Sequence, residues 1–152
     1  MNTMILVSPE DFSLEAITRA MRESCPQAGA IASFVGTVRN HNEGDRVSTL
    51  TLEHYPGMTE KSLGLIVEKA YARWPLEAVH VHHRVGPLQV GDQIVCVVVA
   101  SAHRQAAFEA CEYIMDWLKT EAPFWKKETT PEGERWVDAR ESDEAAKARW
   151  GV

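Results

Sequence analysis

Residues 78–104 read AVHVHHRVGPLQVGDQIVCVVVASAHR, and most of the expected fold follows from this stretch. Its first part has the alternation of a strand, and the Gly-Pro and Gly-Asp pairs predict turns. The second strand, residues 93–101, is almost wholly apolar, which is typical of a strand covered on both faces. We therefore expect this second strand at the centre of a sheet.

Helices are expected on both sides of this unit along the chain. The segment Ser8-Pro9-Glu10-Asp11 has the features of a helix start, because it combines a capping hydroxyl, a proline in the first turn and acids near the positive end of the helix dipole. An apolar face at helical spacing then continues as far as Pro26. Further helices are predicted at residues 59–74, 104–119 and 141–150.

Strands are expected between these helices. They are predicted at residues 4–7, 30–38, 48–55, 124–129 and 134–139, with a polar loop at residues 39–46. Strands that alternate with helices, together with hairpins, favour an α+β (mixed α/β) fold with a largely antiparallel sheet. A chain of 152 residues is long enough for one domain with a true core, so residues 1–152 are predicted to form a single domain.

Composition excludes several classes of protein. With 45% hydrophobic and 25% charged residues, the chain has no apolar run near the roughly 20 residues of a membrane span. The net charge of -6 argues against nonspecific nucleic-acid binding, since that affinity comes from neutralising phosphates with lysine and arginine. The start of the chain has no basic segment before its short apolar run, so no secretory signal is expected and a cytoplasmic location is predicted.

Histidines and cysteines are interpreted as structural residues. His80 and His82 share one strand face and precede His83, but no cysteine pair or carboxylate cluster flanks them. We therefore prefer a solvated sheet face to a metal site. The cysteines are odd in number and lack ligand spacing, so they are interpreted as reduced packing residues; they are Cys25, Cys96 and Cys111. No P-loop, dinucleotide fingerprint or serine elbow is present, and no metal or cofactor is expected.

Basic side chains occur at the ends of the predicted elements, where separate segments can meet at one pocket. They are Arg39, His103, Arg104, Lys119, Lys126 and Lys127. Lys119 and Lys126 bracket Pro123, Phe124 and Trp125, so apolar surface adjoins two of the cations. The plain alternative is that Lys119 complements the negative end of its helix and that the other cations are solvated charges. The pattern alone does not separate these interpretations.

Five segments stand in the order and spacing of one known family. They read GAIASFVGTVR, LEHYPGM, HHRVGPLQVGD, VVVASAHRQAAFEACEYIMDWLK and APFWKKE, and together they span nearly the whole chain. The chain thereby resembles the large catalytic subunit of molybdopterin synthase. The resemblance implies an α/β hammerhead-type fold with a small extra β subdomain. It also implies a homodimer that binds a small ubiquitin-like sulfur-carrier subunit at each end, which makes a heterotetramer.

The resemblance further implies a sulfurtransferase. The carrier's C-terminal Gly-Gly thiocarboxylate would donate sulfur, in two rounds, to cyclic pyranopterin monophosphate, which forms the dithiolene of molybdopterin in molybdenum cofactor biosynthesis. Lys119 would lie beside the thiocarboxylate, and Lys126 would hold the pterin and assist proton transfer. Both the tail and the substrate are anions, so positive charge is needed in one pocket of an acidic protein.

The same resemblance implies the residues that bind the phosphate. Arg39, His103 and Arg104 would form the pocket for the cyclic phosphate, because guanidinium groups suit phosphate oxygens. Arg140 is a candidate contribution from the other protomer. The candidates for apolar walls are Phe34, Met115, Pro123 and Trp125.

Core packing is nevertheless the preferred interpretation for Phe34 and Met115. Two positions depart from the family's pattern, since Leu52 replaces a frequent aromatic and Phe124 replaces the usual isoleucine. These departures concern the shape of the pocket rather than the reaction.

Two other functions stay open. A noncatalytic scaffold that binds a ubiquitin-like tail would tolerate loss of the lysines, and the presence of both lysines favours the enzyme. An enzyme or carrier for another small phosphorylated ligand would fit the cations without the resemblance. A binding assay that compares cyclic pyranopterin monophosphate with ordinary nucleotides separates this last function from the sulfurtransferase.

Overall fold

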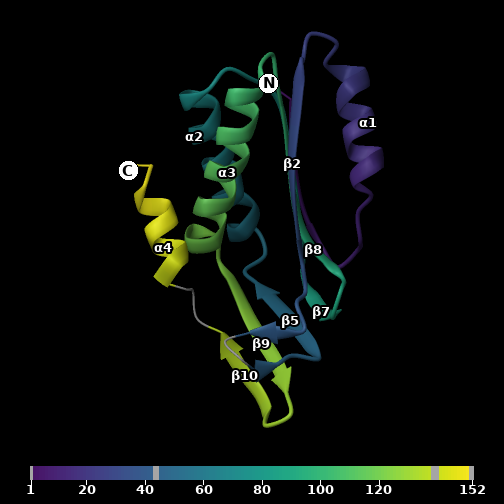
Figure 1. The fold of residues 1–152 in the computed structure, drawn as a ribbon, viewed down its shortest axis with the longest axis vertical. Coiled ribbons are helices and arrows are strands. Elements are labelled where there is room, and N and C mark those ends of the chain that lie inside the picture. The colour runs from purple at the N-terminus through teal and green to yellow at the C-terminus, as the bar shows by residue number, and fades with distance from the viewer. Residues whose placement is uncertain (1, 43–44, 138–140, 151–152) are drawn as a thin grey trace.

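The computed structural model describes residues 2–42, 45–137 and 141–150, which form two joined parts (Figure 1). Among these residues, the larger part is a four-stranded sheet in the order β1-β6-β8-β2 with helices on both faces. Its strands are β1 (Asn2–Ser8), β6 (Leu76–Arg84), β8 (Gln93–Ser101) and β2 (Ala30–Thr37). None of the described helices is long and apolar enough to cross a membrane.

β8 lies between β6 and β2 and pairs antiparallel with both. Val97 stands opposite Val81 on one side and opposite Phe34 on the other. From Val95 to Ser101 the strand is almost inaccessible to solvent, which confirms the predicted central apolar strand. β1 is the exception to the antiparallel pattern, because it pairs parallel with β6 and places Ile5 opposite Val81.

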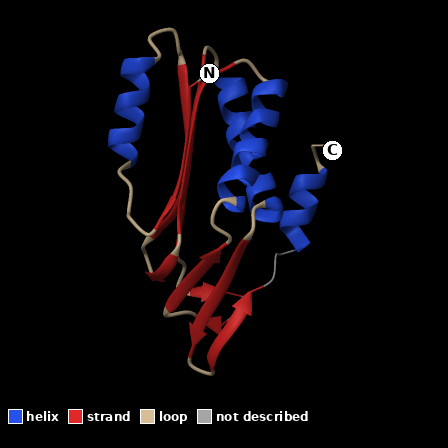
Figure 2. Ribbon diagram, turned by 180° about the vertical axis from the view of Figure 1, so that it is seen from behind, coloured by secondary structure: helices blue, strands red, loops and turns tan. Residues whose placement is uncertain are grey.

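Helices cover both faces of this sheet (Figures 1 and 2). They are α1 (Leu14–Ser24), α2 (Met58–Arg73), α3 (Arg104–Glu121) and α4 (Glu141–Ala148). Because side chains alternate along a strand, Val81 and Val97 pack beneath α2 and α3, whereas Cys96 and Val98 pack with residues of α1. Each face of the sheet therefore has its own apolar core, as binary alternation requires for a sheet covered on both sides.

The smaller part is an antiparallel sheet in the order β10-β9-β5-β7, drawn at the bottom of Figure 1. Its strands are β10 (Gly133–Val137), β9 (Phe124–Thr130), β5 (Thr49–His54) and β7 (Gly86–Gln89). Leu50, Leu52 and Leu88 form its buried core together with Val38. This sheet confirms the mixed α+β fold with a small extra β part. β9 follows α3 closely, so the C-terminal end of α3 lies where the two parts join.

α4 packs on α3 through ion pairs and one aromatic residue. Lys147 pairs with Glu121 at 2.5 Å, and Arg149 pairs with Glu112 at 2.6 Å. The indole N–H of Trp150 donates a hydrogen bond to Asp116 at 2.7 Å. These contacts hold the predicted last helix against the outer side of α3.

The predicted helix start at Ser8 is wrong. Ser8 ends β1 opposite Arg84, and α1 begins after Ser13, whose hydroxyl accepts a hydrogen bond from the Ala16 N–H at 3.2 Å. The carbonyl of Pro9 accepts hydrogen bonds from the Arg84 guanidinium at 3.1 and 3.2 Å. Pairing with a distant strand therefore holds Ser8 in β1, and a second serine, Ser13, caps the helix instead.

Three further expectations differ from the structure. Residues 86–89 are more than a turn, because as β7 they pair with β5. The polar loop predicted at residues 39–46 contains a short pairing of β3 (His41–Asn42) with β4 (Asp45–Arg46). The helical spacing of Phe108, Cys111, Met115 and Leu118 predicts one apolar face, but Phe108 is 65% exposed whereas the other three are buried.

Candidate functional site

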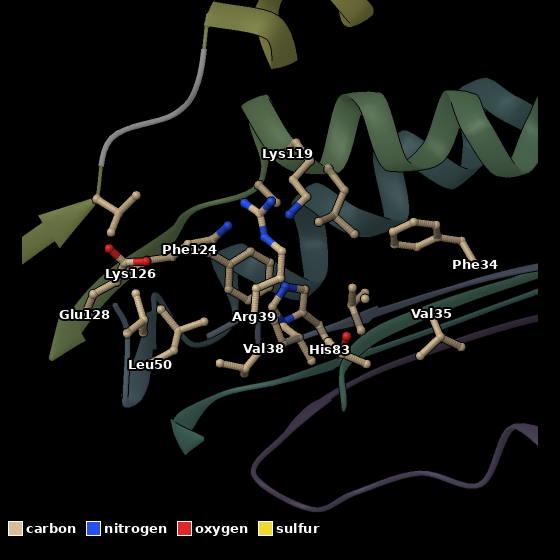
Figure 3. Close-up of a pocket in the computed structure, with 18 of the residues that line it drawn as sticks. Phe34, Val35, Val38, Arg39, Leu50, His83, Lys119, Phe124, Lys126 and Glu128 are labelled. Carbon is tan, nitrogen blue, oxygen red and sulfur yellow. The ribbon is translucent and has the colours of Figure 1, made fainter. Parts of the chain in front are cut away.

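A cavity of about 490 Å³ lies where the two parts meet, beside the C-terminal end of α3 (Figure 3). Its walls come from β2, β6, β8, α3, β5 and β9, so segments far apart in the sequence share one space. The apolar side chains that line it are Phe34, Val35, Val38, Val47, Leu50, Ile94, Val95, Leu118, Ala122, Phe124 and Val137. The charged or titratable ones are Arg39, His41, His83, Lys119, Lys126 and Glu128.

Arg39, Lys119 and Lys126 bring positive charge to this cavity from three elements. Arg39 follows β2, Lys119 lies in the last turn of α3, and Lys126 lies in β9. Figure 3 shows the nitrogen-bearing ends of these side chains directed into the same space. The structure thus brings together the two predicted catalytic lysines and one of the predicted phosphate-binding residues.

The alternation of β9 separates its two neighbouring lysines. Lys126 and Glu128 line the cavity, whereas Lys127 points to the other face of the strand. There the Lys127 ammonium pairs with Glu134 at 3.1 Å and lies 5.7 Å from the ring of Trp136. Because side chains alternate along β9, Lys126 lines the cavity and its neighbour Lys127 does not.

Glu128 is the carboxylate in the cavity wall. Its side chain is buried, and it accepts hydrogen bonds from Arg135 at 3.1 and 3.2 Å. A buried carboxylate requires such a partner, because desolvation of an unpaired charge is costly. Since Arg135 already neutralises Glu128, the carboxylate cancels little of the positive charge that Arg39 and the lysines supply.

His83 forms part of the cavity wall at the end of β6. The ring is only 4% exposed, its Nδ1 lies 2.7 Å from the carbonyl oxygen of Arg84, and it stacks on Phe124 with ring centroids 3.7 Å apart. Burial, which is the largest cause, and the ammonium groups of Lys119 and Lys126 together lower the pKa of His83 to about 3. His83 is therefore a neutral imidazole at physiological pH.

The predicted solvated histidine face is wrong, because His82 and His83 are both buried. His80 and His82 do share one face, with their rings stacked 6.5 Å apart, and burial lowers the pKa of His80. His82 Nε2 lies 3.2 Å from the carbonyl oxygen of Glu10 in the segment before α1. In the described ranges, no group of three or more histidine, cysteine or acidic side chains could hold a metal ion.

The three cysteines are free and buried, which confirms their interpretation as packing residues. Burial raises the pKa of Cys96 to about 11 and that of Cys111 to about 12. A thiol must ionise to act as a nucleophile, so these two cysteines are protonated and unreactive near pH 7.

His103 and Arg104 lie at the other end of α3. His103 is the N-cap residue and Arg104 is the first helical residue, and neither lines the cavity. At about 1.5 Å per residue, the 15 residues from Arg104 to Lys119 span about 22 Å. A single chain therefore does not bring these two residues to the cavity, and their role in phosphate binding stays a prediction.

The other predicted site residues are divided in the same way. Phe34 lines the cavity and is 41% exposed, so the preference for core packing is wrong there, whereas Met115 is buried in the core as expected. Pro123 and Trp125 do not line the cavity, although Phe124 between them does. Arg140 lies outside the described residues.

Sequence reasoning missed His83 and Glu128 as cavity residues. The sequence places His83 on a solvated sheet face in preference to a metal site, yet it stands at the end of a strand, which is the criterion that selects the cations. Glu128 lies two residues beyond Lys126 on the same strand, so alternation places both on one face. The position at a strand end therefore predicts His83, and strand alternation predicts Glu128, as cavity residues.

Comparison with known proteins places this geometry in context. The model of the family described as MoaE protein matches residues 7–121. A molybdopterin synthase catalytic subunit of Ralstonia nicotianae is 60% identical over 148 residues, covering 97% of this chain and 84% of the relative. The subunit of the same name from Escherichia coli is 58% identical over 148 residues, covering 97% and 98%.

The chain is also similar to solved structures of the same family. A molybdopterin biosynthesis MoaE protein from Burkholderia ambifaria matches with a TM-score of 0.85 and 55% identity, covering 100% of this chain and 99% of that one. A molybdopterin synthase structure from Staphylococcus aureus matches with a TM-score of 0.78 and 34% identity, covering 89% and 96%. The similarity therefore extends over both parts of the fold.

Proposed function

Because the chain belongs to the MoaE protein family, whose relatives are named molybdopterin synthase catalytic subunits, we propose that it transfers sulfur to cyclic pyranopterin monophosphate. The proposed donor is the C-terminal Gly-Gly thiocarboxylate of a small ubiquitin-like partner, and the product is the dithiolene of molybdopterin. The observation that carries the proposal is the convergence of Arg39, Lys119 and Lys126 on one cavity.

The charge of the cavity suits this reaction. A thiocarboxylate and a cyclic phosphate are both anions, and they have to meet although the chain carries a net charge of -6. Three cations in a space with largely apolar walls attract such groups more strongly than the same cations would in water. The cavity therefore offers local positive potential that the protein as a whole does not.

Each cation has a proposed role. Lys119 lies beside the thioacyl carbonyl, where its ammonium stabilises the oxyanion that forms when the carbon–sulfur bond breaks and sulfur stays on the substrate. Lys126 holds the pterin and assists proton transfer. Arg39 binds the cyclic phosphate, because its planar guanidinium can donate two parallel hydrogen bonds to phosphate oxygens.

A second copy of the chain completes the proposed site. Since about 22 Å of helix separates Arg104 from Lys119, His103 and Arg104 reach a cavity only in another protomer. In a dimer with two-fold symmetry, each chain then gives its N-terminal end of α3 to its partner and receives the same in return. Arg140 is proposed to act across the same interface. The assembly with two sulfur carriers is a heterotetramer, located in the cytoplasm.

Reconstitution tests the proposal. The chain is mixed with a thiocarboxylated partner and cyclic pyranopterin monophosphate, and molybdopterin is measured in a single turnover. Lys126→Ala should reduce product by roughly 100-fold or more, which is the scale of losing one group that assists proton transfer. Lys127→Ala is the matched control, because its ammonium pairs with Glu134 on the opposite face of β9 and its loss should change the rate less than about 2-fold.

No product from the wild-type chain would contradict the proposed reaction. Tighter binding of ordinary nucleotides than of the pterin precursor would point to another phosphorylated ligand. Equal activity of the Lys126 and Lys127 variants would contradict the assignment of the cavity.

A further inference from the structure

The imidazole of His83 is held in one orientation by two contacts. Phe124 stacks on it with an angle of 15° between the ring planes. The ring nitrogen Nδ1 lies 2.7 Å from the Arg84 carbonyl oxygen, which is a hydrogen-bond distance. One contact fixes the plane of the ring and the other fixes its rotation within that plane, so His83 presents a fixed edge to the cavity.

The hydrogen bond also fixes the tautomer. A carbonyl oxygen can only accept, so Nδ1 carries the proton and donates it to Arg84. In a neutral imidazole the other nitrogen, Nε2, then has a free lone pair. Within the part of the chain that the structure describes, Nε2 of His83 has no hydrogen-bond partner of its own. The ring therefore brings an unused acceptor to the cavity wall.

The groups that face His83 keep this acceptor available. Lys119 from α3, Lys126 from β9 and Arg39 after β2 line the same cavity, and all three oppose a further positive charge. The carboxylate that faces the cavity from β9, Glu128, is bound to Arg135. Burial and the two lysines hold the pKa of His83 far below neutrality, so Nε2 accepts throughout the physiological range.

We propose that His83 is a specificity-determining residue of the cavity, whose Nε2 accepts a hydrogen bond from an N–H or O–H group of the bound pterin precursor. The inference rests on the proposed function and deepens it. The cations of the cavity recognise negative charge, which the carrier's tail and any phosphate also possess. His83 adds a demand for a donor, which the ring system of a pterin carries and a fully ionised phosphate or thiocarboxylate lacks.

Two substitutions separate the nitrogens of the ring. His83→Asn keeps an N–H near the position of Nδ1 but removes the acceptor at the cavity, whereas His83→Gln can place an amide oxygen near the position of Nε2. Calorimetric titration of the full-length chain with cyclic pyranopterin monophosphate should show roughly 3- to 10-fold weaker binding for His83→Asn, the size of one net hydrogen bond. His83→Gln should recover most of this loss. Inorganic phosphate, which probes the cations alone, should bind both variants like the wild type.

A second measurement uses the wild-type chain, so it does not depend on whether a variant folds. The ¹⁵N signals of the His83 ring in the wild-type chain should report a proton on Nδ1 and a bare Nε2 at pH 7. Adding the pterin precursor should shift the Nε2 signal toward that of a hydrogen-bonded nitrogen, and adding inorganic phosphate should not. An Nε2 signal that is unchanged by the precursor would overturn the inference, as would unaltered precursor affinity in His83→Asn.

The two proposals fail in different ways. If the wild-type chain makes molybdopterin and binds the precursor while His83→Asn binds it equally well, only the role of His83 is lost. If the wild-type chain neither binds the precursor nor forms product, the proposed function is lost and the role of His83 with it.

Discussion

The two ends of α3 carry cations in opposite surroundings. At the C-terminal end, Lys119 is exposed but lines the cavity, and its neighbour Leu118 is 4% exposed. At the N-terminal end, His103 and Arg104 are exposed and do not line the cavity, and Phe108 is 65% exposed. One helix thus joins a cavity end to an open end.

The difference shows which cation local stability can explain. A cation at a helix C-terminus is favourable because it faces the negative end of the dipole, so Lys119 has a structural reason as well as a proposed chemical one. Arg104 has the opposite placement, and the first turn of α3 holds no acidic residue to offset it. Arg104 weakens its own helix end, and an anion bound there in the dimer would account for it.

The largest expected effect tests the cavity end. Lys119→Ala should cost only about 0.3–1 kcal/mol of stability as a dipole partner, but should reduce sulfur transfer by roughly 100-fold or more if its ammonium stabilises the oxyanion. Lys119→Arg keeps the charge at the helix end and should also be impaired, because its donors lie elsewhere. Single-turnover product and denaturant unfolding are measured on both variants. Near-normal product from Lys119→Ala would reduce Lys119 to its structural role.

The next effect comes from His83, in the cavity wall. The folded chain does not protonate His83 until about pH 3, whereas the unfolded chain does so near pH 6.5, so stability falls as pH decreases from 6.5 toward 3. Between pH 8 and pH 5 this single group should remove about 2 kcal/mol from the free energy of unfolding. His83→Asn should flatten the pH dependence by that amount.

The open end gives a smaller effect on binding. Arg104→Ala should weaken binding of the pterin precursor by about 10-fold, because one charge-assisted hydrogen bond is lost. It should leave the affinity for the sulfur-carrier partner nearly unchanged. Calorimetry with each ligand measures both. Loss of partner binding with unchanged precursor binding would reverse the assignment of the two anions.

A mixing experiment sharpens this result. If Arg104 acts in the partner's cavity, a mixed dimer of Lys119→Ala and Arg104→Ala chains contains one site with both residues intact. At a low concentration of the precursor, product formation should therefore rise above the mean of the two separate variants when they are dissociated together and allowed to re-form dimers. An unchanged rate after confirmed exchange of chains would contradict a site shared between protomers.

The smallest expected effect is that of a chelator. The chain should be a stable dimer of 17.0 kDa subunits, and removal of metal ions should change neither its mass in solution nor its unfolding midpoint. The described residues offer no group of ligands that a structural metal needs. In a monomer, about 22 Å of helix would keep Arg104 away from the cavity. A monomeric mass in solution would therefore contradict the shared site. Dissociation or unfolding on chelation would equally contradict a metal-free dimer.

Much of the fold could be predicted because it depends on local patterns. The apolar run of β8 required cover on both faces, and Lys119 stood in the last turn of a helix that Pro123 would not continue. Arg39 and Lys126 were found by the same rule, that sites form at the ends of elements.

The errors came from contacts between segments distant in sequence. The segment from Ser8 to Asp11 resembled a helix start, and only the pairing of Ser8 with Arg84 of β6 shows that Ser8 belongs to a strand. His83 resembled a surface residue, and only the packing of β9 and Phe124 buried it. The separation of Arg104 from Lys119 was different, because the rise of a helix already gave about 22 Å. The length of the predicted helix is therefore enough to place Arg104 and Lys119 in different regions of one chain.

The central place of β8 has a consequence for synthesis of the chain. Translation proceeds from the N-terminus, so β1, β2 and β6 all leave the ribosome before β8, which pairs with two of them. Until Ser101 has emerged, β2 has no partner in this sheet and β6 lacks its partner along one edge, so both expose unpaired N–H and C=O groups that can pair with other chains. The interval between the synthesis of β2 and that of β8 is therefore a period in which the nascent protein needs protection from aggregation.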